Sequence, residues 1–559
     1  MARARSSERS GRVGPARATA VLVALAVAVG VLVAGCGGSS HKQTQTQTHS
    51  ATQTAASKKP AAPVIKPVAV VKDTPSAAGR SGDQMQVTIY DLRRYGPFVT
   101  LDFGIQCLQP SAGCSTINDF SAAQQSATES YTAGGVSLVD PVGNKRYWPV
   151  LDGQQRPDSS LLPLGIGDSA IHLAWVTFAA PAASVRTMDV VLPNGGPVIP
   201  GVPITTGAAP SAREVGAGVA PATPAQFSQP SSSTNISGLT APVDNLILTA
   251  GNPNGSDAES SHTETVTLRT DVLFAFDKSS LTPKARSVLA GVATQVKSRA
   301  AGPVQVTGYT DSIGTDAVNI PLSQARAQSV AGALRPMTPG ITYRTAGMGS
   351  ADPVAPNTNP DGSDNPAGRA LNRRVTISFA VKAPEKPTPP PAAAPAATGS
   401  AAGGSLPQTV NYKANVPSIG LDTYQVTLQS LVRSGDMVVL SLAITCQSGP
   451  DQECDSYAWS GTPTVPPVPA LQGNSSQVAA TAANTLTGAY LVDPASGTEY
   501  IPVTDVSNDP AADPIPAEPQ MGQSYTAWAF FPAPPTTTTA VTVVLPGGSP
   551  RIAGVPIAG

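Results

Sequence analysis

Residues 308–314 read GYTDSIG, and residues 319–327 read NIPLSQARA. The apolar run VQV at 304–306 predicts a short buried strand before them, and the second stretch opens a helical pattern with an apolar stripe. Asp311 would then lie in the loop that leaves the strand, and Arg326 in the helix that follows. Ligands commonly bind at such a strand-to-helix corner of an α/β sheet.

The residue pair Asp311 and Arg326 suits a zwitterionic ligand. A carboxylate accepts hydrogen bonds from an ammonium group, and a guanidinium fork holds a carboxylate through two parallel hydrogen bonds. Each residue alone also has an ordinary interpretation. Asp311 would cap its own turn, and Arg326 would be a solvated helix charge.

Four sequence blocks together resemble the OmpA-like peptidoglycan-binding domain family. In chain order they are VLFAFD at 272–277 with LT at 281–282, the central stretch 311–327, GMG at 347–349 with Pro353, and GRALNRRV at 368–375. The family most often has His where this chain has Tyr309, a position beside the motif. The resemblance favours ligand binding over the ordinary interpretation of Asp311 and Arg326.

This resemblance implies non-covalent, non-catalytic binding of peptidoglycan by residues 239–382. In the family, the residues that match Asp311 and Arg326 hold the free amino-acid end of diaminopimelate in the stem peptide. Asp311 is therefore expected to accept the ammonium group and Arg326 to hold the carboxylate. We expect further hydrogen-bond donors from the backbone amides of Ser312, Ile313 and Gly314.

Three other polar residues near the motif are candidate contacts. Asn319 is expected to fix the loop or to cap the second helix, with direct ligand contact as the alternative. Arg373 and Arg374 are candidates for contact with glycan or with stem-peptide carboxylates, and an ion pair at a sheet edge is the equal alternative.

The N-terminus has the pattern of a targeting segment. Several arginines precede an apolar run at 18–34, and the run ends in LVAGC at 32–36. This ending resembles a bacterial lipobox with Cys36 as the lipidated residue, and an uncleaved anchor or an ordinary signal peptide is the alternative. Residues 1–36 thus predict an exported lipoprotein, anchored by lipid to a membrane of the cell envelope and facing the cell wall.

The remaining cysteines form two local pairs. In an exported chain, they predict the disulfides Cys107–Cys114 and Cys446–Cys454. Each would stabilise its module by about 2 kcal/mol in the chain-entropy picture. A metal site is not expected, because each module offers two thiols and no nearby His pair, and the sequence indicates no cofactor.

An internal repeat flanks the central segment. Residues 87–107 align without a gap with residues 426–446, and the blocks LVDP and GVPI recur in both copies. Short alternating runs separated by turn residues predict an antiparallel β-sandwich for each copy, with Trp175 and Trp528 packed between the two sheets.

The predicted organisation is multidomain α+β, with a central OmpA-like α/β sandwich of βαβαβ type between two related antiparallel β-sandwich modules. Its parts are the signal peptide 1–36, a disordered tether 37–82, the first module 83–204, a linker 205–238, the central domain 239–382, a Pro/Ala-rich linker 383–410 and the second module 411–559.

The overall composition and the motifs of the chain argue against some classes of function. The net charge is −1 and 13% of the residues are charged, which gives no electrostatic basis for binding nucleic acid. Catalytic motifs are not found, so an enzyme is not expected. A protein-interaction scaffold is the alternative function, in which the repeated modules bind a protein partner and the central domain only localises them.

Overall fold

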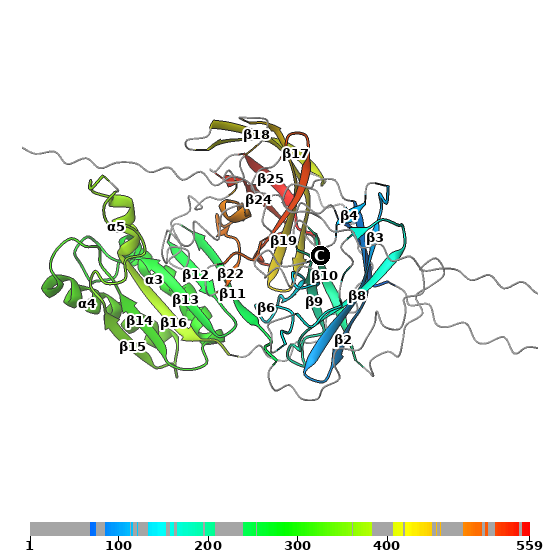
Figure 1. The fold of residues 1–559 in the computed structure, drawn as a ribbon. Helices are drawn as coiled ribbons and strands as arrows, with labels where there is room; N and C mark the ends of the chain where they lie inside the picture. The colour runs from blue at the N-terminus through cyan, green and yellow to red at the C-terminus, as the bar shows by residue number, and fades with distance from the viewer. Residues whose placement is uncertain are drawn as a thin grey trace, which may run out of the picture. The chain divides into compact units, whose positions relative to one another are not determined.

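The structure is a computed structural model. It describes residues 67–73, 84–206, 239–382, 406–449 and 485–559, with short gaps inside these ranges, and also residues 454 and 459. The predicted signal peptide with Cys36 and most of the tether and linker residues lie outside this part of the chain. The described residues form mostly strands with few helices (Figure 1). Among them, no helix is both long and apolar enough to cross a membrane.

The central segment, residues 239–382, is a mixed sheet with helices. Its elements are β11 (Val243–Asn252), β12 (Gly255–Glu259), β13 (Thr263–Arg269), α2 (Thr270–Leu273), α3 (Pro283–Arg299), β14 (Val304–Gly308), α4 (Asp316–Leu334), β15 (Tyr343–Gly347), α5 (Pro366–Asn372) and β16 (Arg374–Ala380). The strands pair in the order β11, β12, β13, β16, β14, β15. Only β14 and β15 pair in parallel, because α4 connects them as a crossover.

One face of this sheet carries the core. In β14, Val304 and Val306 are buried while Gln305 and Thr307 are half-buried, which is the period of a strand covered on one side. Helices α3 and α4 supply the other half of the core, including Leu289 and Val330. The sequence Thr282-Pro283 predicts a helix start, with Thr as N-cap and Pro at the first position, and α3 does begin at Pro283.

Two parts of the central segment differ from expectation. The apolar runs at 246–248 and 266–268 predict two strands across a turn region at 252–261, but this region contains β12, which pairs on both sides. The sequence GSDAE of β12 has no apolar alternation to indicate a strand, so backbone pairing with its two neighbours determines its conformation. The sequence predicts a short helix or turn at 370–373, but α5 begins earlier, at Pro366, since Asn365 caps it through a hydrogen bond from Gly368 N at 3.0 Å.

The first β segment contains β1 (Ala69–Asp73), β2 (Met85–Tyr95), β3 (Phe98–Cys107), β4 (Cys114–Ser115), β5 (Ser137–Asp140), β6 (Lys145–Tyr147), β7 (Gly165–Ile166), β8 (Ile171–Ala179), β9 (Thr187–Val191) and β10 (Val198–Thr206). The tether prediction was wrong at β1, which pairs with β2 and packs Ala69 and Val71 against the core. The pairing is antiparallel except where residues 204–206 of β10 run parallel to β2.

The last β segment contains β17 (Gln408–Val416), β18 (Gly420–Ser434), β19 (Met437–Ser448), β20 (Tyr490–Val492), β21 (Glu499–Tyr500), β22 (Thr504–Asp505), β23 (Ser524–Pro532), β24 (Ala540–Val544) and β25 (Arg551–Pro556). Its first strand begins at Gln408, inside the predicted linker. The Pro/Ala-rich composition ends before this point, and Tyr412 and Ala414 of β17 are buried in the core.

The aligned strands of the two sequence copies form the same hairpin, one in each copy. The register of β2 and β3 shifts between Ile89 and Asp91, and that of β18 and β19 shifts between Leu428 and Ser430, the positions that align in the repeat. A bulge at the same place gives both hairpins the same local bend. Both predicted disulfides, Cys107–Cys114 and Cys446–Cys454, are present.

The two tryptophans of the repeat are buried, as predicted, but outside the clusters that hold their strand neighbours; Trp528 packs in a second buried cluster with Val439 and Phe530. In β8, Ala174 and Val176 belong to the core, and in β23 so do Ala527 and Ala529. Since neighbours in a strand point to opposite faces, the tryptophans between these residues face away from that core.

An acidic cluster is buried beneath α3 in the central segment. Glu264 of β13 is fully buried and Asp257 of β12 lies close by. Arg299 Nε lies 3.1 Å from Glu264 Oε2, but neither oxygen of this carboxylate accepts a well-aligned hydrogen bond. Burial raises the pKa of Glu264 to about 8, and repulsion from Asp257 adds to the shift.

This raised pKa predicts that Glu264 destabilises the domain as the pH rises, with the loss developing between the ordinary pKa of 4.5 and about 8. The folded state favours the protonated acid, so stability is greatest below the ordinary pKa and falls as the pH rises through about 8. Glu264→Gln should therefore raise the free energy of unfolding by about 2–4 kcal/mol at pH 9 and change it little at pH 4. Denaturant unfolding at both pH values checks this, with the exposed Asp509→Asn as control. Equal effects of Glu264→Gln at both pH values would contradict it.

Candidate functional site

The site lies where β14 ends and α4 begins. Gly308 and Gly347, the last residues of β14 and β15, let α4 pack directly on the strands. A Cβ atom on Gly308 would lie 2.2 Å from the backbone oxygen of Ser323, and one on Gly347 would lie 2.3 Å from Gln324 N. This close approach fixes the distance between the loop after β14 and the third turn of α4, which carries Arg326.

Internal hydrogen bonds hold the loop of residues 309–315. Asp311 Oδ1 accepts from Ile313 N at 3.1 Å, and Asn319 Nδ2 donates to Ile313 O at 3.0 Å. Ser312 N donates to Asn357 Oδ1 at 3.3 Å. The Ser312 and Ile313 amides, which we expected to face a ligand, therefore already donate within the chain. Gly314 has a φ of +95°, which favours glycine.

Asn319 fixes this loop as expected. It lies inside α4 and is 4% exposed, while Thr315 occupies the position before the helix. Its bond to Ile313 therefore joins the helix to the loop.

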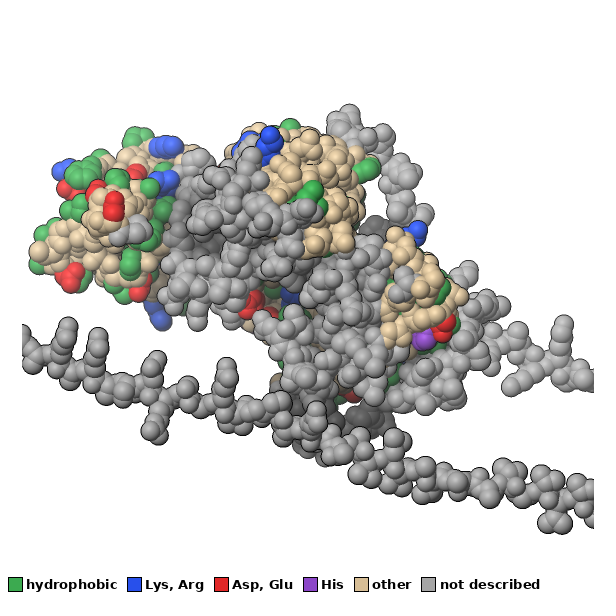
Figure 2. Space-filling model, turned by 45° about the horizontal axis from the view of Figure 1, so that its top comes forward, with side chains coloured by type: hydrophobic (Ala, Val, Ile, Leu, Met, Phe, Trp, Pro, Cys, Tyr) green, Lys and Arg blue, Asp and Glu red, His purple; other side chains and the backbone are tan. Residues whose placement is uncertain are grey.

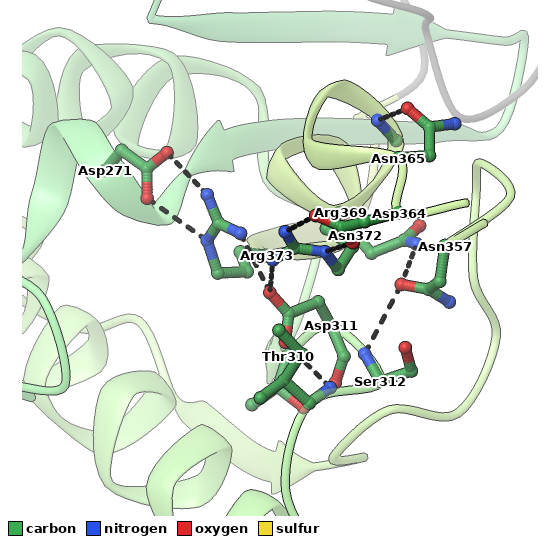
Figure 3. Close-up of polar contacts among 12 residues, drawn as sticks. Asp271, Thr310, Asp311, Ser312, Asn357, Asp364, Asn365, Arg369, Asn372 and Arg373 are labelled. Carbon is green, nitrogen blue, oxygen red and sulfur yellow. Dashed lines mark hydrogen bonds and ion pairs between the residues drawn. The ribbon is translucent and has the colours of Figure 1, made fainter. Parts of the chain in front are cut away.

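The carboxylate of Asp311 is bound by two arginines of the last sequence block. Arg373 Nη1 donates to Asp311 Oδ2 at 2.8 Å, and Arg369 Nη1 lies 3.5 Å from the same oxygen. Each arginine also holds a second carboxylate through two nitrogens, Arg373 that of Asp271 and Arg369 that of Asp364. We call Asp271, Arg373, Asp311, Arg369 and Asp364 the Asp–Arg chain; Figure 3 shows its alternating contacts.

Arg326 lies apart from this chain. It is 4% exposed, its Nε donates to Lys278 O at 3.0 Å, and its guanidinium carbon is 5.6 Å from the centre of the Phe274 ring. No hydrogen bond from its two terminal nitrogens is found among the described residues. Burial lowers the pKa of Arg326, against the attraction of Asp277, Asp271 and Asp311.

Asp311 and Arg326 therefore do not form a direct ion pair in the described structure. Each is within electrostatic range of the other, and Arg373 rather than Arg326 bonds to Asp311. The sequence indicated Asp311 and Arg326, and it gave Arg373 as a candidate for ligand contact or an ion pair, but it did not indicate Arg369 as a site residue. The four-residue spacing of Arg369 and Arg373 was the available signal, because it places Arg369 in α5 and Arg373, the C-cap residue, one helical turn apart.

The neighbours Arg373 and Arg374 have different surroundings. Arg374 is 5% exposed, and its terminal nitrogens donate to the backbone oxygens of Asn372 and Asp352. Its guanidinium carbon lies 3.7 Å from the centre of the Tyr309 ring. Arg374 therefore offers almost no surface to a ligand, and Tyr309 serves as its aromatic partner.

Exposed apolar side chains surround the site. Phe276 is 87% exposed, Ile313 61% and Val318 60%, and Ile320 and Met348 are also exposed. In Figure 2, green hydrophobic and red acidic side chains lie close together on the surface of the central segment, at the left of the view. No group of three or more His, Cys, Asp or Glu residues in the described ranges is arranged to hold a metal ion.

Comparison with known proteins finds similarity within the central segment. Residues 273–366 match the OmpA family. Peptidoglycan-binding protein ArfA of Mycobacterium tuberculosis is 39% identical over 107 residues, which are 19% of this chain and 31% of that protein. Probable lipoprotein YiaD of Escherichia coli is 43% identical over 110 residues, 19% of this chain and 47% of that protein.

Other similarities are confined to the same share of the chain. Photosystem I P700 chlorophyll a apoprotein A2 of Gloeobacter violaceus is 44% identical over 108 residues, 19% of this chain and 12% of that protein. The structure of the cell wall anchor of the T6SS from Pseudomonas aeruginosa is 32% identical and covers 23% of this chain and 89% of its own, with a TM-score of 0.20. For ArfA, YiaD and the photosystem I protein, the match spans less than half of the relative's length.

Proposed function

Since residues 273–366 form an OmpA-family domain, we propose that this chain binds peptidoglycan without covalent chemistry, through the diaminopimelate of the stem peptide. The matched domain and the peptidoglycan-binding relative ArfA support binding to peptidoglycan in general. The charge arrangement at the site carries the more specific proposal for diaminopimelate.

The Asp–Arg chain has one negative charge in excess. It contains the three carboxylates of Asp271, Asp311 and Asp364 and the two guanidinium groups of Arg369 and Arg373, and two positive charges leave one of three negative charges uncompensated. A ligand ammonium at Asp311 would make the chain neutral.

Arg326 supplies the opposite charge. Its buried guanidinium keeps two terminal nitrogens without a partner in the described structure, and burial makes such donors strong ligands for a carboxylate. The ammonium and carboxylate at the free end of diaminopimelate match the excess charges on the two sides of the site. The exposed side chains of Ile313 and Phe276 would contact its methylene groups.

Co-sedimentation of the full chain with purified peptidoglycan tests the proposal. Diaminopimelate-type peptidoglycan should retain the chain, and lysine-type peptidoglycan should retain less because the lysine side chain lacks the second carboxylate. Binding should weaken as salt rises. The Asp311→Ala, Arg326→Ala double variant should stay in the supernatant, whereas Arg344→Ala, an exposed arginine of β15, should sediment normally. Equal sedimentation of the double variant and the unchanged chain would show that this clamp is wrong.

We further propose that the chain acts in the cell envelope as a lipoprotein anchored through Cys36. The probable lipoprotein YiaD among the relatives supports this location. Metabolic labelling with a fatty-acid analogue tests it: the unchanged chain should be labelled and Cys36→Ala should not.

A second function is proposed for the repeated β segments, taken as β-sandwich domains at 83–204 and 411–559 beside a central domain at 239–382. They share the position of a bulge, strand pairing and a disulfide. A common protein partner, with the central domain as localising element, would account for keeping two copies. Cross-linking in cells with each copy deleted in turn should change the set of partners; an unchanged set would exclude this role.

A further inference from the structure

Both carboxylate oxygens of Asp311 already have partners at the place where the proposed function puts the ligand's ammonium group. Its Oδ1 accepts from Ile313 N, and its Oδ2 is held by Arg373 at 2.8 Å with Arg369 at 3.5 Å. An ammonium group needs one of these oxygens, and it meets two guanidinium groups of the same charge. For the ammonium group to bond to Oδ2, one of these two cations must move away.

Arg373 is the cation that can move away from Asp311. Its Nη1 faces Asp311, while its Nε and Nη2 bond to Asp271 at 3.3 and 3.1 Å. The guanidinium group is a rigid fork with donors along separate edges, so Arg373 can release Asp311 and keep both bonds to Asp271. Figure 3 shows Arg373 between the two carboxylates.

We propose that Arg373 is a displaceable internal cation of the diaminopimelate site and that Asp271 is the positioning residue that retains it when the ligand's ammonium group takes its place on Asp311. This inference rests on the proposed function. It adds Asp271, which lies outside the matched segment 273–366, to the determinants of specificity.

The charge count explains why Asp271 is needed. With Asp271, the Asp–Arg chain has three carboxylates against two guanidinium groups. Without it, Asp311 and Asp364 already balance Arg369 and Arg373, and an ammonium group would enter a neutral cluster and leave Arg373 unpaired. The side chain of Asp271 is 51% exposed, so its replacement by asparagine disturbs no packed core.

The test compares two stem tripeptides, one with free diaminopimelate and one whose terminal diaminopimelate amine is acetylated, by calorimetric titration of the full chain. Asp271→Asn should bind the free-amine peptide about tenfold more weakly, as expected when one charge-assisted hydrogen bond is weakened. It should bind the acetylated peptide as the unchanged chain does. Asp271→Glu should restore the difference between the two peptides, and Arg373→Gln should bind the free-amine peptide more tightly.

Other outcomes would overturn the inference. If Arg373→Gln weakens binding of both peptides, Arg373 contacts the ligand itself and is not displaced. If Asp271→Asn binds the free-amine peptide with unchanged affinity, Asp271 does not position Arg373. Failure of the proposed function has a different signature, in which the unchanged chain binds neither peptide or Arg326→Gln binds both normally; the inference then falls with it.

Discussion

Replacing Arg326 by methionine is expected to lower the affinity for a diaminopimelate-containing stem peptide about 100-fold, because two charge-assisted hydrogen bonds to its carboxylate are lost. The free energy of unfolding should stay the same or rise by about 1 kcal/mol, since a buried guanidinium without a direct ion pair costs desolvation that methionine does not. Methionine is also unbranched and can keep the contact with the Phe274 ring.

The decisive feature of this prediction is that the affinity for the peptide falls while the free energy of unfolding stays the same or rises. Titration with the peptide and denaturant unfolding measure the two quantities on the same variant. Arg344→Met, which removes an exposed arginine from β15, should change neither. If Arg326→Met loses stability by several kcal/mol, Arg326 is mainly a structural residue, and reduced binding would no longer indicate contact with the ligand.

The parts of the fold that the sequence predicted depend on local signals. Thr282 followed by Pro283 marks the start of α3, and Thr282 Oγ1 indeed accepts from Ala285 N at 3.1 Å. The apolar run at 304–306 marks β14. By contrast, β12 and β1 form because neighbouring strands supply their backbone partners, and that information lies far away in the sequence.

The sequence predicted which blocks supply the residues of the candidate site, but not which of these residues bond to one another. Arg326, Arg369 and Arg373 all belong to blocks that the sequence indicated, yet nothing local determines which of them reaches Asp311. The answer depends on where α5 meets the loop after β14. Arg373 follows the last turn of α5 and Arg374 opens β16, so one of these adjacent arginines bonds to Asp311 and the other lies against the half-buried Tyr309 ring.

Burial also gives the two halves of the site different roles. Arg326 is held by backbone and ring contacts that do not depend on a ligand. The Asp–Arg chain instead consists of partly exposed ion pairs, which are weak enough to exchange partners. Arg326 is thus a fixed cation, and Asp311 is an anion that can exchange partners. In the proposed complex, the ligand's carboxylate would bind Arg326 and set the ligand's position, and its ammonium group would then compete for Asp311.

Gly308→Ala is expected to destabilise the central domain by about 3 kcal/mol and to weaken peptide binding, because the new methyl group overpacks the contact between β14 and α4. Its Cβ would lie 2.2 Å from the backbone oxygen of Ser323 and 2.9 Å from the carbonyl carbon, so the helix itself must move. Asp311 and Arg326 lie on the two sides of this contact, and their separation would change with it.

Gly332 in α4 provides the control for this prediction. Gly332 has open space where a Cβ atom would lie, and Gly332→Ala should stabilise the helix by about 0.5–1 kcal/mol through its higher helix propensity. Denaturant unfolding and peptide titration of both variants separate a steric effect from a general effect of alanine. Wild-type stability and affinity for Gly308→Ala would show that α4 is not seated on β14 through this glycine, and the geometry that relates Arg326 to Asp311 would need another origin.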